Sequence, residues 1–353
     1  MLDVLLFYVS KGAKIIRLDA VGFLWKKDNS TCIHLHETHA IIKIIRLVID
    51  KIAPGVLLVT ETNVPHIENI SYFGNGDEAH MVYNFTLPPL LAFSLLNETT
   101  TKLQEWAGKL ELRHEGTCFF NFLSSHDGVG LRPVDGILEH EELQTILDAA
   151  QANGGKVSYR HDKGLPSPYE VNCNYFSLLH GVESDKGLAI KRTLLAHAIL
   201  LSFPGLPAIY FHSIFGQEND LKGLENSGYN RAINRQKFTL DNIEKNIREN
   251  GSSANMILRH IGQLIRVKQS HPQFHPLANF EIPFVEDGLL CIKKWTKTDP
   301  ASSLYTYFNL SGKTRRIILP EPSNDILNDN DRSITVDELK PYDFAWYRSH
   351  QHH

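Results

Sequence analysis

Three carboxylate residues, Asp19, Glu61 and Asp127, follow short apolar runs that are typical of buried parallel strands. Arg17 stands two positions before Asp19, and His126 stands directly before Asp127. Residues two apart on a strand leave from the same face, so Arg17 and Asp19 form a charged pair at a strand end. Burying such charges is costly unless they meet each other and a ligand. These three strand ends are therefore the first candidates for chemistry.

Two carboxylates that flank a glycosidic bond are the minimum for glycoside chemistry. One attacks C1 or activates water, and the other protonates the leaving oxygen. Asp19, beside Arg17, is favoured as the ionised group, and Glu61 as the acid. Asp127, beside His126, could bind sugar hydroxyls and stabilise positive charge on the ring. Each residue taken singly also fits a helix cap or an ordinary polar loop group, and it is the coincidence of three strand ends that favours catalysis.

The apolar periodicity predicts the elements that must position these residues. Strands are predicted at 13–18, 56–61, 81–85, 117–123 and 207–211. Helices are predicted at 41–52, 90–108, 139–152, 175–179, 186–202 and 254–270, with a long irregular loop at 153–174. About five strand–helix units in succession indicate a parallel sheet with helices outside it.

Two architectures fit such an alternation of strands and helices. An open doubly wound sheet usually carries a glycine-rich phosphate-binding turn after its first strand, and the sequence has none there. In a β/α barrel the functional residues lie at the C-terminal ends of several strands, as Asp19, Glu61 and the His126–Asp127 pair do. We therefore predict an α/β fold of the barrel type.

The pattern changes after about residue 280. Short strand signals at 289–292, 304–308, 316–319 and 344–347 alternate with turn residues, which predicts a small antiparallel β-domain. The predicted domains are thus a catalytic β/α barrel at 1–277 and a C-terminal β-domain at 278–348. Residues 349–353, which are rich in histidine, are predicted to be a disordered tail.

The composition is that of an ordinary globular protein, with 353 residues, 42% of them hydrophobic and 22% charged. The net charge of −4 gives no general affinity for nucleic acid or for anionic membranes. The longest apolar stretch, 194–211, contains Pro204 and Pro207, which favour a helix and turn in a core over a membrane span. The four cysteines lack disulfide or metal-ligand spacing, which predicts reduced thiols in a cytoplasmic protein. The sequence carries no sign of oligomeric state.

The strand-end residues also carry a resemblance. Arg17-Leu-Asp19-Ala20, Thr60-Glu61 and Ser125-His126-Asp127 resemble, in this order, three of the four short motifs of the α-amylase superfamily, glycoside hydrolase family 13. The resemblance implies that Asp19 is the nucleophile, Glu61 the acid/base and Asp127 the stabiliser of the transition state. It also implies that Arg17 and His126 contact the sugar that is transferred.

Longer stretches resemble the sucrose phosphorylase branch of this superfamily. They are 82–90, 126–130, 169–176 and 230–235, and within the branch 132–138 and 208–212 are most similar to glucosylglycerate phosphorylases. By this resemblance Arg231 contacts the donor glucose, and Tyr169 helps to receive phosphate or the acceptor. Residues of these two types in polar loops are also often only solvated.

The function implied by the resemblance is that of a retaining α-glucoside phosphorylase of the glucosylglycerate or sucrose type. Its partners would be a small glucoside and inorganic phosphate, and no metal or organic cofactor is implied. Two alternatives stay open: an α-glucosidase or transglycosylase that uses the same carboxylates, and a non-catalytic remnant that binds sugar or a partner protein. The motifs around Asp19 and Glu61 do not separate a phosphorylase from an α-glucosidase or transglycosylase, because the acceptor site is built from loops.

The sequence also departs from the family's pattern. A closed barrel needs eight strands, whereas five are predicted here and the first of them matches the family's fourth. The family's Asp-x-x-x-x-His motif is absent. We therefore expect a partial (β/α)8 TIM barrel that comprises strands 4 to 8, from the C-terminal part of a longer enzyme. Its open sheet edges would lack partners, so we expect this chain alone to be poorly soluble or inactive.

Overall fold

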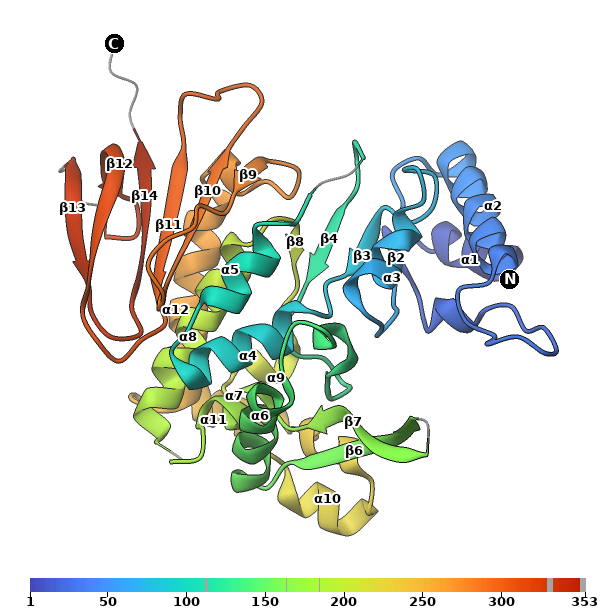
Figure 1. Cartoon of the computed structure of the whole chain (residues 1–353), viewed down its shortest axis with the longest axis horizontal. Coiled ribbons are helices and arrows are strands. Elements are labelled where there is room, and N and C mark those ends of the chain that lie inside the picture. Colours follow the sequence, from blue (N-terminus) through green and yellow to red (C-terminus); the bar gives the residue numbers. More distant parts are fainter. Residues whose placement is uncertain (112–113, 163, 184, 329–332, 350–353) are drawn as a thin grey trace.

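The first sheet of the protein is parallel and open. The computed structural model describes residues 1–111, 114–162, 164–183, 185–328 and 333–349. Five strands lie in the order β1-β2-β3-β4-β8, and all neighbours are parallel (Figure 1). They are β1 (Ile15–Leu18), β2 (Leu57–Thr60), β3 (Met81–Tyr83), β4 (Cys118–Asn121) and β8 (Leu206–Pro207). Within the described ranges β1 and β8 each pair on one side only, which gives the arrangement of a partial β/α barrel.

The two faces of this sheet carry alternate side chains of each strand. Val59, Met81 and Cys118 pack together on the inner face. Leu58, from the opposite face of β2, packs against the helix that precedes this strand. Arg17 pairs in register with Val59, so its side chain belongs to the inner face. The strand that carries the first charged pair therefore directs it into the barrel.

Helices connect the strands and cover the outer face of the sheet. The helices are α1 (Leu2–Ser10), α2 (His36–Ile52), α3 (His66–Ile70), α4 (Leu87–Asn97), α5 (Thr101–Ala107), α6 (His140–Ala152), α7 (Tyr175–Leu179), α8 (Lys186–Ser202), α9 (Phe211–Ile214), α10 (Leu221–Ser227), α11 (Leu240–Arg248) and α12 (Ser253–Gln269). Ile45 and Ile49 of α2 recur at helical spacing and are buried on Leu58. The single helix predicted at 90–108 is instead two, because Glu98 takes a left-handed conformation (φ 56°) that ends α4.

The predicted irregular loop at 153–174 is wrong. Strands β6 (Lys156–Asp162) and β7 (Leu165–Asn172) form a hairpin there, and β5 (Val129–Gly130) adds a third antiparallel strand. A register shift between Ser158 and Tyr159 breaks the apolar alternation. Pro166 and Pro168 pair with β6 and not with β5. A proline has no N–H to donate, and here the open side of the strand needs none. These two features hid the hairpin from the sequence pattern.

The predicted strand at 207–211 is also mostly wrong. Strand β8 holds two residues, Leu206 and Pro207, and the chain then turns into the short helix α9. Helices α10 and α11 were not predicted, and neither contains a fully buried residue. In α11, Leu240, Ile243 and Ile247 recur at helical spacing, a short period that the prediction missed.

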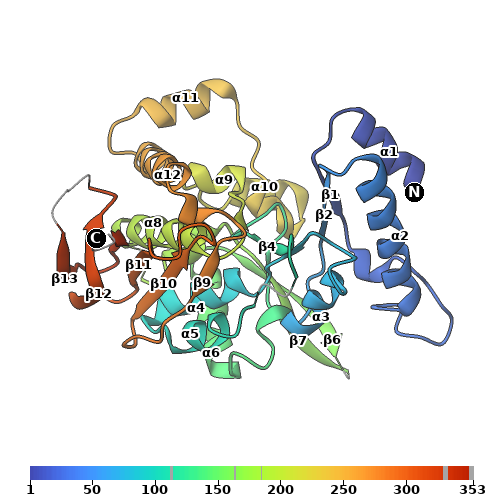
Figure 2. The ribbon, with the colours of Figure 1, turned by 90° about the horizontal axis from the view of Figure 1, so that it is seen from above.

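The second large sheet is antiparallel and contains six strands in the order β13-β12-β14-β11-β10-β9. They are β9 (Asn279–Glu281), β10 (Leu289–Trp295), β11 (Leu304–Asn309), β12 (Arg315–Asp325), β13 (Ile334–Leu339) and β14 (Phe344–Ser349). This sheet and the α1–α2 unit lie at opposite ends of the molecule (Figure 2). We propose that the folded chain divides into two domains after residue 277, as predicted from the sequence. Of the predicted tail, Ser349 ends β14, and residues 350–353 lie outside the described residues.

The C-terminal sheet completes a helix of the barrel part. Asp287, in the turn before β10, accepts hydrogen bonds from the backbone N–H groups of Thr100 and Thr101 at 2.7 and 3.1 Å. The hydroxyl of Thr99 donates to the same carboxylate at 2.9 Å. Because the first N–H groups of a helix have no partner inside it, Asp287 acts as the N-terminal cap of α5.

The open end of the barrel part keeps apolar side chains in contact with solvent. Val4, Phe7 and Tyr8 of α1 are between 51% and 55% exposed, and Ile15 of the edge strand β1 is 45% exposed. None of the helices in the described part of the chain has the length and apolar character needed to cross a membrane.

Candidate active site

The first two carboxylates lie side by side because their strands pair in parallel. Leu18 pairs with Thr60, and the N–H of Glu61 donates to the carbonyl of Leu18 at 3.1 Å. Asp19 and Glu61 are each the next residue of their strand, so both follow the inner-face direction of Arg17. This confirms that the two strand ends meet, as the sequence predicts.

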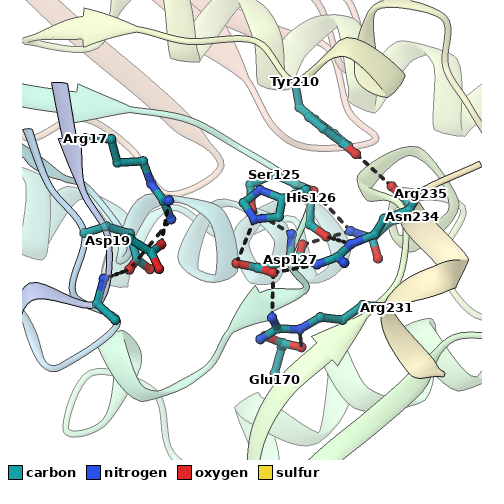
Figure 3. A network of polar contacts seen from close by, with 12 residues as sticks. Arg17, Asp19, Ser125, His126, Asp127, Glu170, Tyr210, Arg231, Asn234 and Arg235 are labelled. Atoms are coloured by element: carbon teal, nitrogen blue, oxygen red, sulfur yellow. Dashed lines mark hydrogen bonds and ion pairs between the residues drawn. The ribbon is translucent and has the colours of Figure 1, made fainter. Parts of the chain in front are cut away.

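Arg17 connects the two carboxylates. Its Nη1 lies 2.6 Å from Oδ1 of Asp19, and its Nη2 lies 3.7 Å from Oε2 of Glu61 (Figure 3). The guanidinium also stacks over the ring of Tyr83, 5.6 Å from its centre. The Asp19 side chain is 73% exposed, whereas that of Glu61 is 15% exposed. One cation thus holds two carboxylates that differ strongly in their access to solvent.

This difference in burial matters for Glu61. Burial raises the pKa of Glu61 above its ordinary value, although the N–H of Ala20 and the charge of Arg17 act in the opposite direction. The Ala20 N–H donates to Oε2 of Glu61 at 2.9 Å, and Ala20 has a left-handed backbone (φ 45°). A carboxyl group with a raised pKa keeps its proton to higher pH, which suits a general acid.

Asp127 lies on a loop after β4 that is tied down through its backbone. Asn234, which is 2% exposed, donates from Nδ2 to the carbonyls of Ser125 and Asp127 at 3.1 and 2.9 Å. The hydroxyl of Ser125 accepts from the N–H of Asp127 at 3.1 Å. The hydroxyl of Tyr210 donates to the carbonyl of Asn234 at 2.9 Å. The position of Asp127 is therefore set by a segment about a hundred residues further along the chain.

Two arginines hold the Asp127 carboxylate. Arg231 donates from Nη1 to Oδ1 of Asp127 at 2.6 Å, and Arg235 donates from Nη2 to the same oxygen at 2.9 Å. Arg231 also forms a two-point ion pair with Glu170, at 3.0 and 2.7 Å. A Cβ atom on Gly128 would lie 2.6 Å from Cγ of Glu170, so glycine at this position makes room for that pair.

The predicted site residues come together to different degrees. Asp19, Glu61, Asp127, Tyr169 and Arg231 all line one cavity of about 360 Å³, which is within the usual size of small-molecule sites. Arg17 contacts two of these residues. His126 lies beside Asp127, with Nε2 3.5 Å from its Oδ2, but its side chain is 54% exposed and does not line the cavity.

Sequence reasoning did not single out several residues of this network. Glu170, Asn234 and Arg235 carry much of the geometry around Asp127. Arg132 and Arg160 also line the cavity. Glu170 directly follows Tyr169, and Arg235 ends the stretch 230–235. Both therefore stand within the stretches that resemble the sucrose phosphorylase branch. In the described part of the chain, no three His, Cys, Asp or Glu residues group so that they could hold a metal ion.

Comparison with solved structures identifies the fold. The crystal structure of sucrose 6F-phosphate phosphorylase from Thermoanaerobacter thermosaccharolyticum matches with a TM-score of 0.73 at 22% identity, over 88% of this chain and 58% of that one. An α-amylase from Geobacillus thermoleovorans matches with a TM-score of 0.62 at 12% identity, over 100% and 63% of the two chains. The predicted partial barrel with a C-terminal antiparallel sheet is thus confirmed as the fold of α-amylase-type enzymes.

Sequence relatives are more specific, although no family model matches the chain. The glucosylglycerate phosphorylase of Escherichia coli (strain K12) is 41% identical over 99% of this chain and 62% of its own length. That of Allomeiothermus silvanus is 47% identical over 79% of this chain and 51% of its own length. The chain therefore spans about half to three fifths of these relatives. The resemblance to the sucrose and glucosylglycerate phosphorylase branch of the α-amylase superfamily is confirmed.

Proposed function

We propose that the chain carries the catalytic carboxylates of a retaining α-glucoside phosphorylase of the glucosylglycerate or sucrose type. Its substrates are a small glucoside and inorganic phosphate, and its product is α-glucose 1-phosphate. The observation that carries the proposal is that Asp19, Glu61 and Asp127 line one cavity, in a chain whose relatives at 41–47% identity are named glucosylglycerate phosphorylases. We place the protein in the cytoplasm.

In the first step Asp19 attacks C1 of the glucosyl unit while Glu61 gives its proton to the departing oxygen. A bond forms between C1 and the Asp19 carboxylate, and the bond from C1 to the leaving oxygen breaks. In the second step a phosphate oxygen attacks C1, Glu61 takes up a proton and the Asp19 carboxylate is released. Two inversions at C1 retain the α configuration.

The other residues have supporting roles in this proposal. Asp127 binds hydroxyls of the sugar and stabilises the positive charge that develops on the ring. Arg231 lies within 2.6 Å of Asp127 and contacts the same sugar, while Arg17 and His126 complete the contacts around it. Tyr169, on strand β7, helps to receive phosphate or the acceptor.

The test is the release of α-glucose 1-phosphate from glucosylglycerate and from sucrose, with and without phosphate. Phosphorolysis predicts a product that forms only with phosphate, and Asp19→Asn should abolish it. Glucose released at the same rate with and without phosphate would instead support the α-glucosidase alternative. Because the chain spans only part of its relatives, the assay is repeated with the chain joined to the part of the E. coli relative that it lacks. No turnover in either form, with sugar binding retained, would support a non-catalytic sugar-binding protein.

A further inference from the structure

The arginines of the active-site region differ in their partners. Arg17, Arg231 and Arg235 each pair with one or two carboxylates, at distances between 2.6 and 3.7 Å. Arg132 lines the same cavity, yet no ion pair joins it to any residue that the structure describes. Its Nε atom is buried and has no hydrogen-bond partner there. A buried donor without an acceptor is costly, and a charged donor more so. The Nε–H of Arg132 therefore has no hydrogen-bond acceptor among the described residues, and a bound ligand could supply one.

The backbone holds Arg132 in a fixed place. It begins a short 3-10 helix (Arg132–Val134) whose second residue is Pro133. The N–H of Leu131 donates to the carbonyl of Tyr169 at 3.0 Å, which joins this helix to the hairpin strand β7. The carbonyl of Arg132 accepts from the N–H of Asp135 at 3.0 Å. The backbone of Arg132 is therefore already in place before a ligand binds, which lowers the cost of ordering this segment.

Tyr169 provides a second donor beside Arg132. Burial raises the pKa of the Tyr169 hydroxyl, and the neighbouring Glu170 adds to this effect, while Arg231 and Arg132 act against it. The phenol is therefore protonated at neutral pH and can donate a hydrogen bond. A guanidinium and a hydroxyl together suit the oxygens of a carboxylate or a phosphate. Asp19, Glu61 and Asp127 also line this cavity and would repel an anion, so an anionic group fits beside Arg132. Arg160 is a further cation in the lining.

We propose that Arg132, together with Tyr169, binds the anionic oxygens of the leaving acceptor or of the attacking nucleophile. This group is either the carboxylate of a glycerate-type acceptor or inorganic phosphate. The inference rests on the proposed function and deepens it, because it assigns a specificity-determining residue to an acceptor site. A neutral acceptor of similar size would gain nothing from this arginine.

The test measures binding, so it does not depend on turnover. The full chain is titrated calorimetrically with D-glycerate, with inorganic phosphate and with neutral glycerol. Arg132→Gln should weaken the binding of an anion by about ten- to a hundredfold, as expected for the loss of a charge-assisted hydrogen bond, and should leave glycerol unchanged. Arg132→Lys keeps the charge and should lose less. The control is Arg316→Gln, an exposed arginine on strand β12, and circular dichroism checks that each variant is folded.

Each outcome decides the assignment. Weaker binding of glycerate alone assigns Arg132 to the acceptor carboxylate, and weaker binding of phosphate alone assigns it to phosphate. An effect on both, with competition between the two anions, shows one anion site that is used in turn. Equal affinities of Arg132→Gln and wild type, or a wild-type chain that binds neither anion, overturn the inference. A chain that binds anions through Arg132 but forms no α-glucose 1-phosphate keeps the site and removes only the proposed function.

Discussion

Arg231 and Glu170 form a two-point ion pair in which Nε and Nη2 of the arginine donate to the two carboxylate oxygens at 3.0 and 2.7 Å. The hydrogen bonds from Arg231 to Glu170 hold the pKa of Arg231 above its ordinary value. The Glu170 side chain is 5% exposed, so this pair is shielded from solvent on one side. The third donor of Arg231, Nη1, is thereby aimed at Asp127. Glu170 thus positions Arg231, the arginine that we propose contacts the sugar.

We expect Glu170→Gln to weaken the binding of α-glucose 1-phosphate by roughly tenfold, because Arg231 loses one of two charge-assisted hydrogen bonds. Titration calorimetry measures this without turnover. Arg231→Lys should weaken binding similarly, and the double variant should be less affected than the sum of the two, because both changes act through one pair. Glu244→Gln is the matched control, since the Glu244–Arg248 pair lies on the solvent face of α11. Fully additive effects would show that Glu170 does not act through Arg231.

Glu61→Gln should remove the proposed proton donor and leave Asp19, the proposed nucleophile, in place. We expect the release of glycerate from glucosylglycerate to fall roughly a hundredfold or more, the usual contribution of a general acid. α-Glucosyl fluoride needs little protonation of its leaving group, so the first step should remain fast with this substrate. Asp19→Asn should abolish the reaction of both substrates. A Glu61→Gln variant that is equally impaired on both substrates would contradict the assignment of Glu61 as the acid.

The same group predicts a pH dependence. Because burial raises the pKa of Glu61, the acid form persists to higher pH than for an exposed glutamate. The rate constant kcat/KM for glucosylglycerate should fall as the pH rises through that raised pKa. The measurement is a pH profile of both substrates, and α-glucosyl fluoride should lack this fall. If the two profiles coincide, another group controls the alkaline side.

Replacing Lys294 by an apolar residue should make the protein more stable. Its side chain is fully buried, and its Nζ has no hydrogen-bond partner among the described residues. Burial lowers the pKa of Lys294 well below its ordinary value, and the neighbouring Lys268 lowers it further. Between the lowered pKa and the ordinary one, the unfolded chain binds a proton that the folded chain does not. The resulting cost in stability fades as the pH rises towards the ordinary lysine pKa. Lys294→Met should raise the free energy of unfolding at pH 7 by about 1 kcal/mol or more.

Thermal unfolding at pH 7 and pH 10 tests this prediction. The increase in Tm should be roughly 2–4 °C per kcal/mol at pH 7 and smaller at pH 10. Lys297→Met, at a side chain that is 72% exposed, serves as the control and should leave Tm nearly unchanged. A Tm for Lys294→Met that is lower than that of the wild type at pH 7 would mean that the ammonium has a partner in the folded protein.

Replacing Asp287, which joins the C-terminal sheet to helix α5, should make the protein less stable. Asp287→Ala should lower the free energy of unfolding by about 1–2 kcal/mol, because the first turn of α5 loses its cap. Burial raises the pKa of Asp287, but the hydrogen bonds from Thr99, Thr100 and Thr101 lower it by more. Its contribution is therefore present above the ordinary aspartate pKa and is lost as the pH falls through the lowered value.

Urea unfolding at pH 7 and pH 3 checks the effect of Asp287→Ala. The difference between variant and wild type should shrink at pH 3. The same difference at both pH values would show that the Asp287 side chain contributes through packing rather than through its charge.

Much of the fold could be predicted because strong apolar runs mark it. The strands at Ile16, Val59 and Val82 are marked by short apolar runs, and α2 and α12 bury one face at helical spacing. The hairpin β6–β7 escaped because a register shift and two prolines obscure its alternation. Helix α10 escaped because it is short and contains no fully buried residue, and α11 escaped although Leu240, Ile243 and Ile247 stand at helical spacing.

The candidate site divides in a similar way. Asp19 and Glu61 could be placed side by side because parallel strands align their ends. The neighbourhood of Asp127 could not be derived in this way, because Arg231, Asn234 and Arg235 reach it from a loop more than a hundred residues away. Contacts of this kind depend on how loops fold over the sheet, and no periodicity records them. Short motifs could place Arg231 there only by resemblance.

The cap of helix α5 links the order of synthesis to the order of folding. Asp287 lies 186 positions after Thr101, so this helix leaves the ribosome long before its capping carboxylate exists. Until the turn before β10 arrives, the first N–H groups of α5 can bond only to water. Helix α5 therefore obtains its cap only after the turn before β10 has been made. A nascent chain stopped before that point would hold its helices together less firmly than the finished protein does.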